Sequence, residues 1–112
     1  MLIENTLLFK AIEMLAANAD DQRGYLRKIG TFPSTDELAL EFDDAYRPFI
    51  GKLNHDDLLN PIVIDLKKID SLLDLYSDME DKTIWLENSL DNHLWAEVRE
   101  IASLVLKDIE KI

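Results

Sequence analysis

Apolar residues recur every three or four positions through most of this chain of 112 residues, and this spacing constrains the fold more than any other feature. Such a stripe places apolar side chains on one face of an α-helix, whereas a half-buried strand requires strict alternation. The last segment carries such a series, namely Leu94, Val98, Ile101, Val105 and Ile109. No hairpin turn signal separates the segments. The sequence therefore predicts an all-α protein, a compact bundle of four to five helices.

Glycine and proline mark the end of the first helical segment, which covers residues 1–30. Gly30 is predicted to stop it in a left-handed conformation, and Pro33 indicates that a loop has begun. Gly24 lies inside the segment. It either separates two helices at about residues 20–24 or is tolerated within one helix at about 1 kcal/mol relative to alanine. The spacing leaves both arrangements open.

The second predicted helix begins at Ser34 and is rich in acids, with five in residues 34–46. Ser34 and Glu37 have the spacing of a capping box, in which the hydroxyl and the carboxylate each accept a hydrogen bond from a backbone N–H. The helix dipole also favours acids in the first turn. Pro48 and Gly51 are predicted to end this helix.

Asn60 and Pro61 open the third predicted helix, because proline at the first helical position loses no hydrogen bond. Residues 62–64 have the composition of a short buried strand, but helical spacing continues after them, so that a helix is preferred. A short helix is predicted over 83–90, and the last helix from about Asn92.

The composition is that of a globular protein that folds without disulfides. The absence of cysteine excludes disulfide bonds, thiolate metal sites and cysteine nucleophiles. With 47% hydrophobic residues, three glycines and three prolines, residues 1–112 are predicted to form one ordered domain. No run approaches the length of a membrane span. Charged residues interrupt the apolar N-terminal segment, so that no signal peptide is predicted and the expected location is cytoplasmic.

Acidic charge is concentrated in the middle of the chain. The net charge is -11, and residues 36–81 carry thirteen acids against four bases. A field of this sign repels nucleic-acid phosphates and anionic lipids, and it attracts basic proteins. We therefore expect a basic protein partner, and neither nucleic acid nor a membrane.

Acidic residues recur at helical spacing along two of the predicted helices, and residues at this spacing lie along one edge of a helix. The predicted partner-binding carboxylates are Glu37, Glu41 and Asp44 on the second helix and Asp70, Asp74 and Asp78 on the third. Solvated helix faces also carry charge, but they usually mix the two signs, and these stripes do not. Tyr46 directly follows the first stripe. A buried ring would belong to the core, and an exposed ring would anchor the interface, with the acids as its rim.

Acid pairs one helical turn apart also occur in metal sites. Glu41 and Asp44 form one such pair, and Glu97 and Glu100 form another. All-α nucleotide pyrophosphohydrolases hold magnesium with acid pairs on neighbouring helices, but they also need basic residues for the phosphates, and the middle of this chain has few. We predict no catalytic residue, no cofactor and no metal site.

These features resemble the small, acidic, helical immunity proteins that bacteria make against the toxins of contact-dependent growth inhibition. The resemblance rests on size, on the acidic middle and on the lack of a catalytic motif, and it covers the whole chain as a type. It implies a non-enzymatic protein that neutralises a basic, nuclease-like toxin domain through an acidic surface of residues 36–81. The alternatives are a magnesium-dependent all-α nucleotide hydrolase and a helical adaptor protein.

Overall fold

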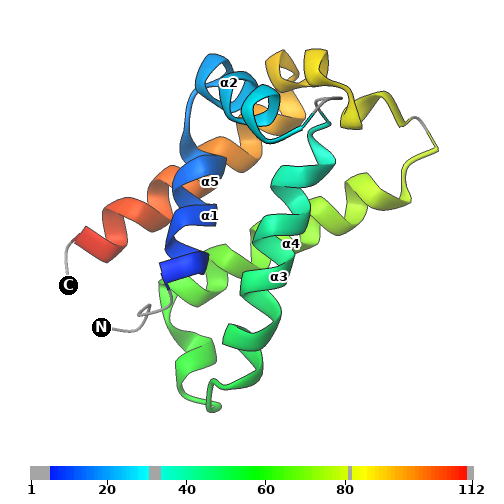
Figure 1. Ribbon diagram of the computed structural model, residues 1–112. Helices are drawn as coiled ribbons and strands as arrows, with labels where there is room; N and C mark the ends of the chain where they lie inside the picture. Colours follow the sequence, from blue (N-terminus) through cyan, green and yellow to red (C-terminus); the bar gives the residue numbers. More distant parts are fainter. Residues whose placement is uncertain (1–5, 31–33, 81, 111–112) are drawn as a thin grey trace.

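The computed structural model describes residues 6–30, 34–80 and 82–110, and these form five α-helices and three short 3₁₀ helices (Figure 1). The α-helices are α1 (Thr6–Ala16), α2 (Ala19–Ile29), α3 (Asp36–Gly51), α4 (Pro61–Asp78) and α5 (His93–Glu110). The 3₁₀ helices are η1 (Asp57–Leu59), η2 (Lys82–Trp85) and η3 (Glu87–Asp91). The all-α prediction is confirmed.

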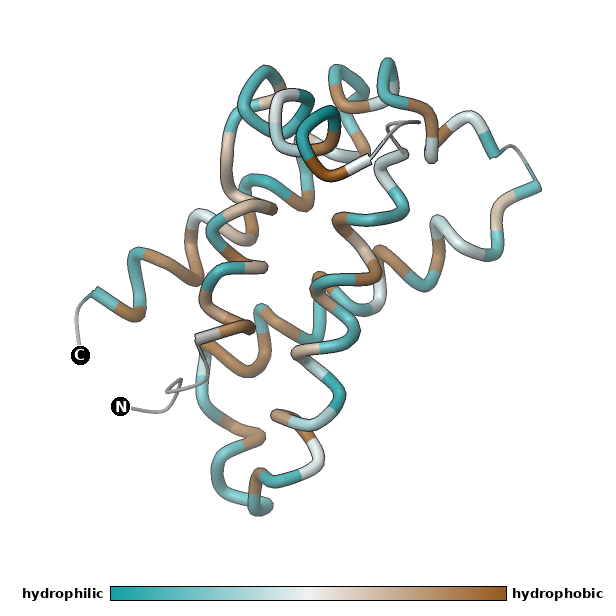
Figure 2. Tube along the Cα trace, viewed as in Figure 1, coloured by the Kyte–Doolittle hydropathy of each residue, from teal (hydrophilic) through white to brown (hydrophobic). Residues whose placement is uncertain are grey.

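Helix α5 is the central element, because α1 and α4 both pack along it, while α3 packs against α1 (Figure 1). Helix α2 and η3 lie together at one end of the bundle. Hydrophobic and hydrophilic positions alternate along each helix with the period of a helix turn (Figure 2). Trp95, Tyr76 and Phe42 are among the largest fully buried side chains, so that α5, α4 and α3 each contribute an aromatic ring to one core.

The first helical segment is broken into two helices, but the break lies earlier than the sequence indicated. Helix α1 ends at Ala16, and Asn18 caps α2 by accepting a hydrogen bond from the Asp21 amide at 2.8 Å. Gly24 therefore lies inside α2 rather than at a break. Gly30 follows α2 with extended backbone angles, φ -146° and ψ 152°, so the predicted left-handed stop is wrong.

The start of α3 also differs from the prediction, because the expected capping box does not form. Thr35 occupies the N-cap position with helical backbone angles and makes no side-chain cap bond. Its buried hydroxyl instead donates to the Ile84 carbonyl at 2.7 Å, and the Ser34 hydroxyl donates to the Trp85 carbonyl at 3.1 Å. The two hydroxyls attach α3 to η2, a contact between segments far apart in the chain.

The Ile84 carbonyl of η2 accepts hydrogen bonds from side chains at the start of α3, in α5 and in η3. It accepts hydrogen bonds from the Thr35 hydroxyl, from the Trp95 indole N–H at 3.1 Å and from the Ser89 hydroxyl. Trp95 is 1% exposed, so its indole N–H needs an internal acceptor. This oxygen therefore fixes η2 against both α3 and α5.

A buried polar cluster holds the end of α1. Gln22 is 1% exposed, and its Nε2 donates to the carbonyls of Met14 at 3.0 Å and Leu15 at 3.1 Å. Arg99 donates to the Ala17 carbonyl at 3.0 Å and to Gln22 Oε1 at 2.9 Å. The last carbonyls of a helix lack helical amide partners. Gln22 and Arg99 supply these donors, and thereby join α1, α2 and α5.

Replacing Arg99 should destabilise the bundle strongly. Arg99→Met removes the donor to the Ala17 and Leu90 carbonyls and to Gln22 Oε1. A buried acceptor left without a donor costs about 1–3 kcal/mol, so we expect the free energy of unfolding in urea to fall by about 2–4 kcal/mol.

The matched control is Arg27→Met, because the Arg27 side chain is 65% exposed and, among the described residues, pairs only with Glu87. An exposed ion pair contributes about 0–1 kcal/mol, and this variant should lose no more. Equal losses in the two variants would contradict a special role for Arg99.

Candidate functional site

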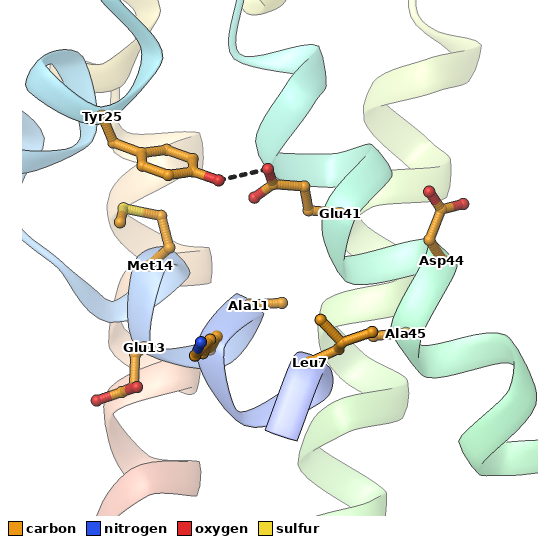
Figure 3. Close-up of a pocket in the computed structure, with 9 residues that line it drawn as sticks. Leu7, Ala11, Glu13, Met14, Tyr25, Glu41, Asp44 and Ala45 are labelled. Atoms are coloured by element: carbon orange, nitrogen blue, oxygen red, sulfur yellow. Dashed lines mark hydrogen bonds between the residues drawn. The ribbon is translucent and has the colours of Figure 1, made fainter. Parts of the chain in front are cut away.

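A groove of about 610 Å³ lies between α1, α2 and α3 (Figure 3). Its volume is within the range of sites that bind small ligands or partner side chains. The groove is lined by Leu7, Lys10, Ala11, Glu13 and Met14 of α1, Tyr25 of α2, and Glu41, Asp44 and Ala45 of α3. It is therefore the place where part of the acidic stripe of α3 meets apolar side chains of α1.

The floor of the groove is apolar, and small residues lie where α1 and α3 meet. Ala11 and Ala45 are each 6% exposed and approach from the two helices. A larger side chain at either position would occupy the space between the helices. Met14 lies beside them, and Leu7, at 71% exposed, continues the apolar floor near Ala45 (Figure 3). Covering this exposed leucine would remove apolar surface from water, which is energetically favourable.

Carboxylates stand above this floor. Glu41 and Asp44, one turn apart, project from α3 (Figure 3). Glu13 projects from α1, and Lys10 is the one base among the described residues that line the groove. The rim is thus acidic overall. Such a rim over an apolar floor suits a ligand that has both a positive charge and an apolar portion.

Tyr25 holds Glu41 in place. Its hydroxyl donates to the Glu41 carboxylate (Figure 3). This hydrogen bond, together with burial and the charges of Glu41 and Glu37, raises the pKa of Tyr25 to about 12. The phenol therefore stays protonated near neutral pH and remains a donor. Glu41 thus accepts a hydrogen bond from a neutral donor.

The Tyr25–Glu41 pair predicts a pH dependence. The folded pKa of Tyr25 lies above that of an exposed tyrosine, about 10. Its contribution to stability is therefore complete below about pH 10 and is lost as the pH rises through about 12. Glu41→Gln removes the charge and should lower the pKa of Tyr25 toward 10, as measured by ring resonances in NMR titrations.

Tyr76 provides the internal control for this titration. Burial, together with the charge of Glu97, raises the pKa of Tyr76 to about 12, and its hydroxyl donates to the Leu94 carbonyl at 2.6 Å rather than to Glu41. Its pKa should not change in the Glu41→Gln variant. An unaltered pKa of Tyr25 in that variant would contradict the assigned hydrogen bond.

The acids of α4 lie on a different surface, around an arginine of α3. Arg47 donates to Asp43 at 2.8 Å and to Asp70 at 3.0 Å, and it lies 4.0 Å from Asp74. Burial raises the pKa of Asp70, and Arg47 acts in the opposite direction. This surface is a shallow depression of about 160 Å³. Its acids are partly neutralised within the protein.

The structure therefore does not bring the two predicted stripes together. Glu41 and Asp44 line the groove toward α1, whereas Asp70 and Asp74 line the depression on the α4 side. The two sites flank the buried face of α3, so these four predicted acids are divided between the groove and the depression. Asp43 and Asp36, which lie off the predicted stripe, are the acids of α3 that line the depression together with Asp70 and Asp74.

The remaining two predicted acids lie at helix ends. Glu37 is exposed in the first turn of α3, on the Tyr25 side, where its charge contributes to the raised pKa of that phenol. Asp78 is exposed and is the last residue of α4, where the helix dipole disfavours an acid. Lys82 Nζ donates to the Ser77 carbonyl at 2.8 Å and brings a positive charge to this end.

Tyr46 belongs to the core, so the first of the two alternatives for this ring holds and its predicted place in a partner interface is wrong. The residue is 3% exposed, and its ring stacks on Phe42 with a centroid distance of 5.1 Å. The Arg47 guanidinium lies 5.8 Å from the ring centroid. Burial, together with the charge of Asp70, raises the pKa of Tyr46. The apolar stripe of α3 is wider than the sequence pattern indicated.

Tyr25 and the residues of α1 were missed at the level of sequence. Two small residues at apolar positions, Ala11 and Ala45, are the one sequence signal that could have pointed to a close approach of the helices. The four-residue spacing of Asp43 and Arg47 could likewise have pointed to their ion pair. No local pattern connects Tyr25 with Glu41, because their contact depends on how α2 crosses the bundle.

The metal-like acid pairs do not converge. Glu97 and Glu100 are exposed on α5, far along the chain from the Glu41 and Asp44 pair. Among the described residues, no group of three His, Asp or Glu side chains is placed to hold a metal ion. None of the described helices has the length and apolar character needed to cross a membrane.

Comparison with protein-family models, with curated proteins and with solved structures found no match for this chain.

Proposed function

We propose that this chain is a non-enzymatic binding protein that inhibits a basic protein partner of the nuclease-like toxin class by holding it against the carboxylates of α3. The observation that carries the proposal is the groove in which Glu41 and Asp44 stand above an apolar floor. Protein interfaces commonly combine an apolar centre with a polar rim, and opposite charges on the partner give specificity.

The acids of α3 are more available to a partner than those of α4. In the described part of the chain, Glu37, Glu41 and Asp44 form no ion pair, whereas Asp70 is paired with Arg47. A cation of the partner can therefore approach the α3 edge without displacing an internal cation. Glu37 and Glu41 are also one turn apart, and like charges at this spacing repel by about 0.2–0.5 kcal/mol. A bound cation would relieve this repulsion.

Inhibition follows from the same charge pattern. A nuclease domain binds nucleic acid with Lys and Arg side chains that contact phosphates. A row of carboxylates along α3 would occupy these side chains in place of phosphates. The net charge of -11 would also steer a basic domain toward this chain, and salt would weaken that steering.

The proposal is tested by co-expression with the product of the gene that adjoins the gene for this chain. We expect that product to arrest growth when expressed alone and this chain to restore growth. Glu41→Gln combined with Asp44→Asn should weaken the protection and lower the affinity of the purified pair by tenfold or more, since truncating a charge pair at an interface costs about 2–5 kcal/mol.

The matched control is Asp74→Asn combined with Asp78→Asn, which removes the same charge from α4. This variant should bind and protect like the unaltered chain. Protection that survives the α3 changes but is lost with the α4 changes would contradict the assigned surface. A partner that binds equally well in low and high salt would contradict the electrostatic basis of the proposal.

A further inference from the structure

We infer that the groove between α1 and α3 receives an amphipathic helix of the partner, with aliphatic side chains against the floor and Arg or Lys side chains against the rim. This inference rests on the function proposed above and names the element of the partner that enters the site. Three properties of the groove lead to it, namely its backbone chemistry, its shape and its charge.

The backbone chemistry favours a helix as the occupant. The groove is walled by α-helices, whose backbone amides and carbonyls are bonded within each helix, so it presents side chains rather than a sheet edge. An extended segment entering it would find no row of backbone partners. A helix satisfies its own backbone hydrogen bonds and needs only side-chain contacts, as in other helix-in-groove complexes.

The shape of the groove suits side chains arranged along one face of a helix. Its floor runs along α1 from Leu7 past Ala11 to Met14, residues that are three or four positions apart. The small side chain of Ala11 leaves depth in the middle, and methionine adapts readily to different partners. Leu7, at 71% exposed, would gain most from being covered.

The charge of the rim selects the polar residues of that helix. Glu41 and Asp44 are three positions apart, which places them about one helical turn apart. Bases one turn apart on the incoming helix have the same interval and can meet both acids. A second copy of this chain fits poorly, because each copy has a net charge of -11 and would bring carboxylates toward carboxylates.

The probe for this inference is a synthetic peptide of about 16 residues, about 24 Å long as a helix, with leucines and arginines along one face. The control peptide has the same composition in a scrambled order without an apolar face. We expect the amphipathic peptide to bind at least tenfold more tightly than the scrambled one in calorimetric titrations with the full chain.

Leu7→Ser and Leu59→Ser form a matched pair of variants, because the two leucines are 71% and 70% exposed and only Leu7 lines the groove. Leu7→Ser should weaken binding of the amphipathic peptide about tenfold, as expected from the loss of one buried leucine contact. Leu59→Ser should leave it unchanged. Lys10→Gln removes the one base of the described lining and should strengthen binding a few-fold.

The outcomes separate this inference from the function on which it rests. Equal affinity for the two peptides, or equal effects of Leu7→Ser and Leu59→Ser, would overturn the helix-in-groove inference. Loss of protection against the adjoining gene product in the Glu41 and Asp44 variant would still support the proposed function. Absence of salt-dependent binding to either basic peptide would overturn the inference and count against the proposed function as well.

Discussion

The arrangement of this bundle depends on the hydrogen bonds that the backbone carbonyls at the C-terminal end of α1 accept. Gln22 donates to the last carbonyls of α1, and Arg99 donates to the carbonyl of Ala17, which follows α1, and to that of Leu90. These bonds hold α2 across the end of α1 and both against α5. The position of α2 in turn brings Tyr25 to Glu41, which closes one end of the groove. A polar cluster in the interior thus sets the geometry of a site at the surface.

The bond network also explains why α3 lies where it does. Its N-terminal end is attached through the Thr35 hydroxyl to the Ile84 carbonyl, which accepts from Trp95 as well. The apolar face of α3 is then turned inward with Phe42 and Tyr46. The acids remain on the two flanks of that face. One flank borders α1 and the other borders α4, so a single helix serves two surfaces of different character.

Much of the fold could be predicted from the sequence, because apolar spacing and capping residues act locally. Asn60 and Pro61 begin α4 as expected, with Asn60 Oδ1 accepting from the Ile62 amide at 2.9 Å. The capping box at Ser34 was wrong because Thr35 occupies the N-cap position, so the Ser34 hydroxyl accepts from the Asp36 amide at 3.3 Å while it donates to the Trp85 carbonyl. The separation of the acidic stripes could not be predicted, since it depends on which helices flank α3. The hydrogen bonds of Arg99 could not be predicted either, because they join it to backbone carbonyls of segments that are distant in the sequence.

Among the described residues of the acidic middle of the chain, some acids pair with an internal cation and others form no ion pair. Asp43 and Asp70 share Arg47, while Glu41 and Asp44 face an open groove. The most direct test is amide chemical-shift mapping of the labelled chain during titration with the leucine–arginine peptide. Binding in the groove predicts the largest shifts in α1, in α3 near Asp44 and at Tyr25. Largest shifts in the C-terminal half of α4, with the groove unaffected, would contradict it.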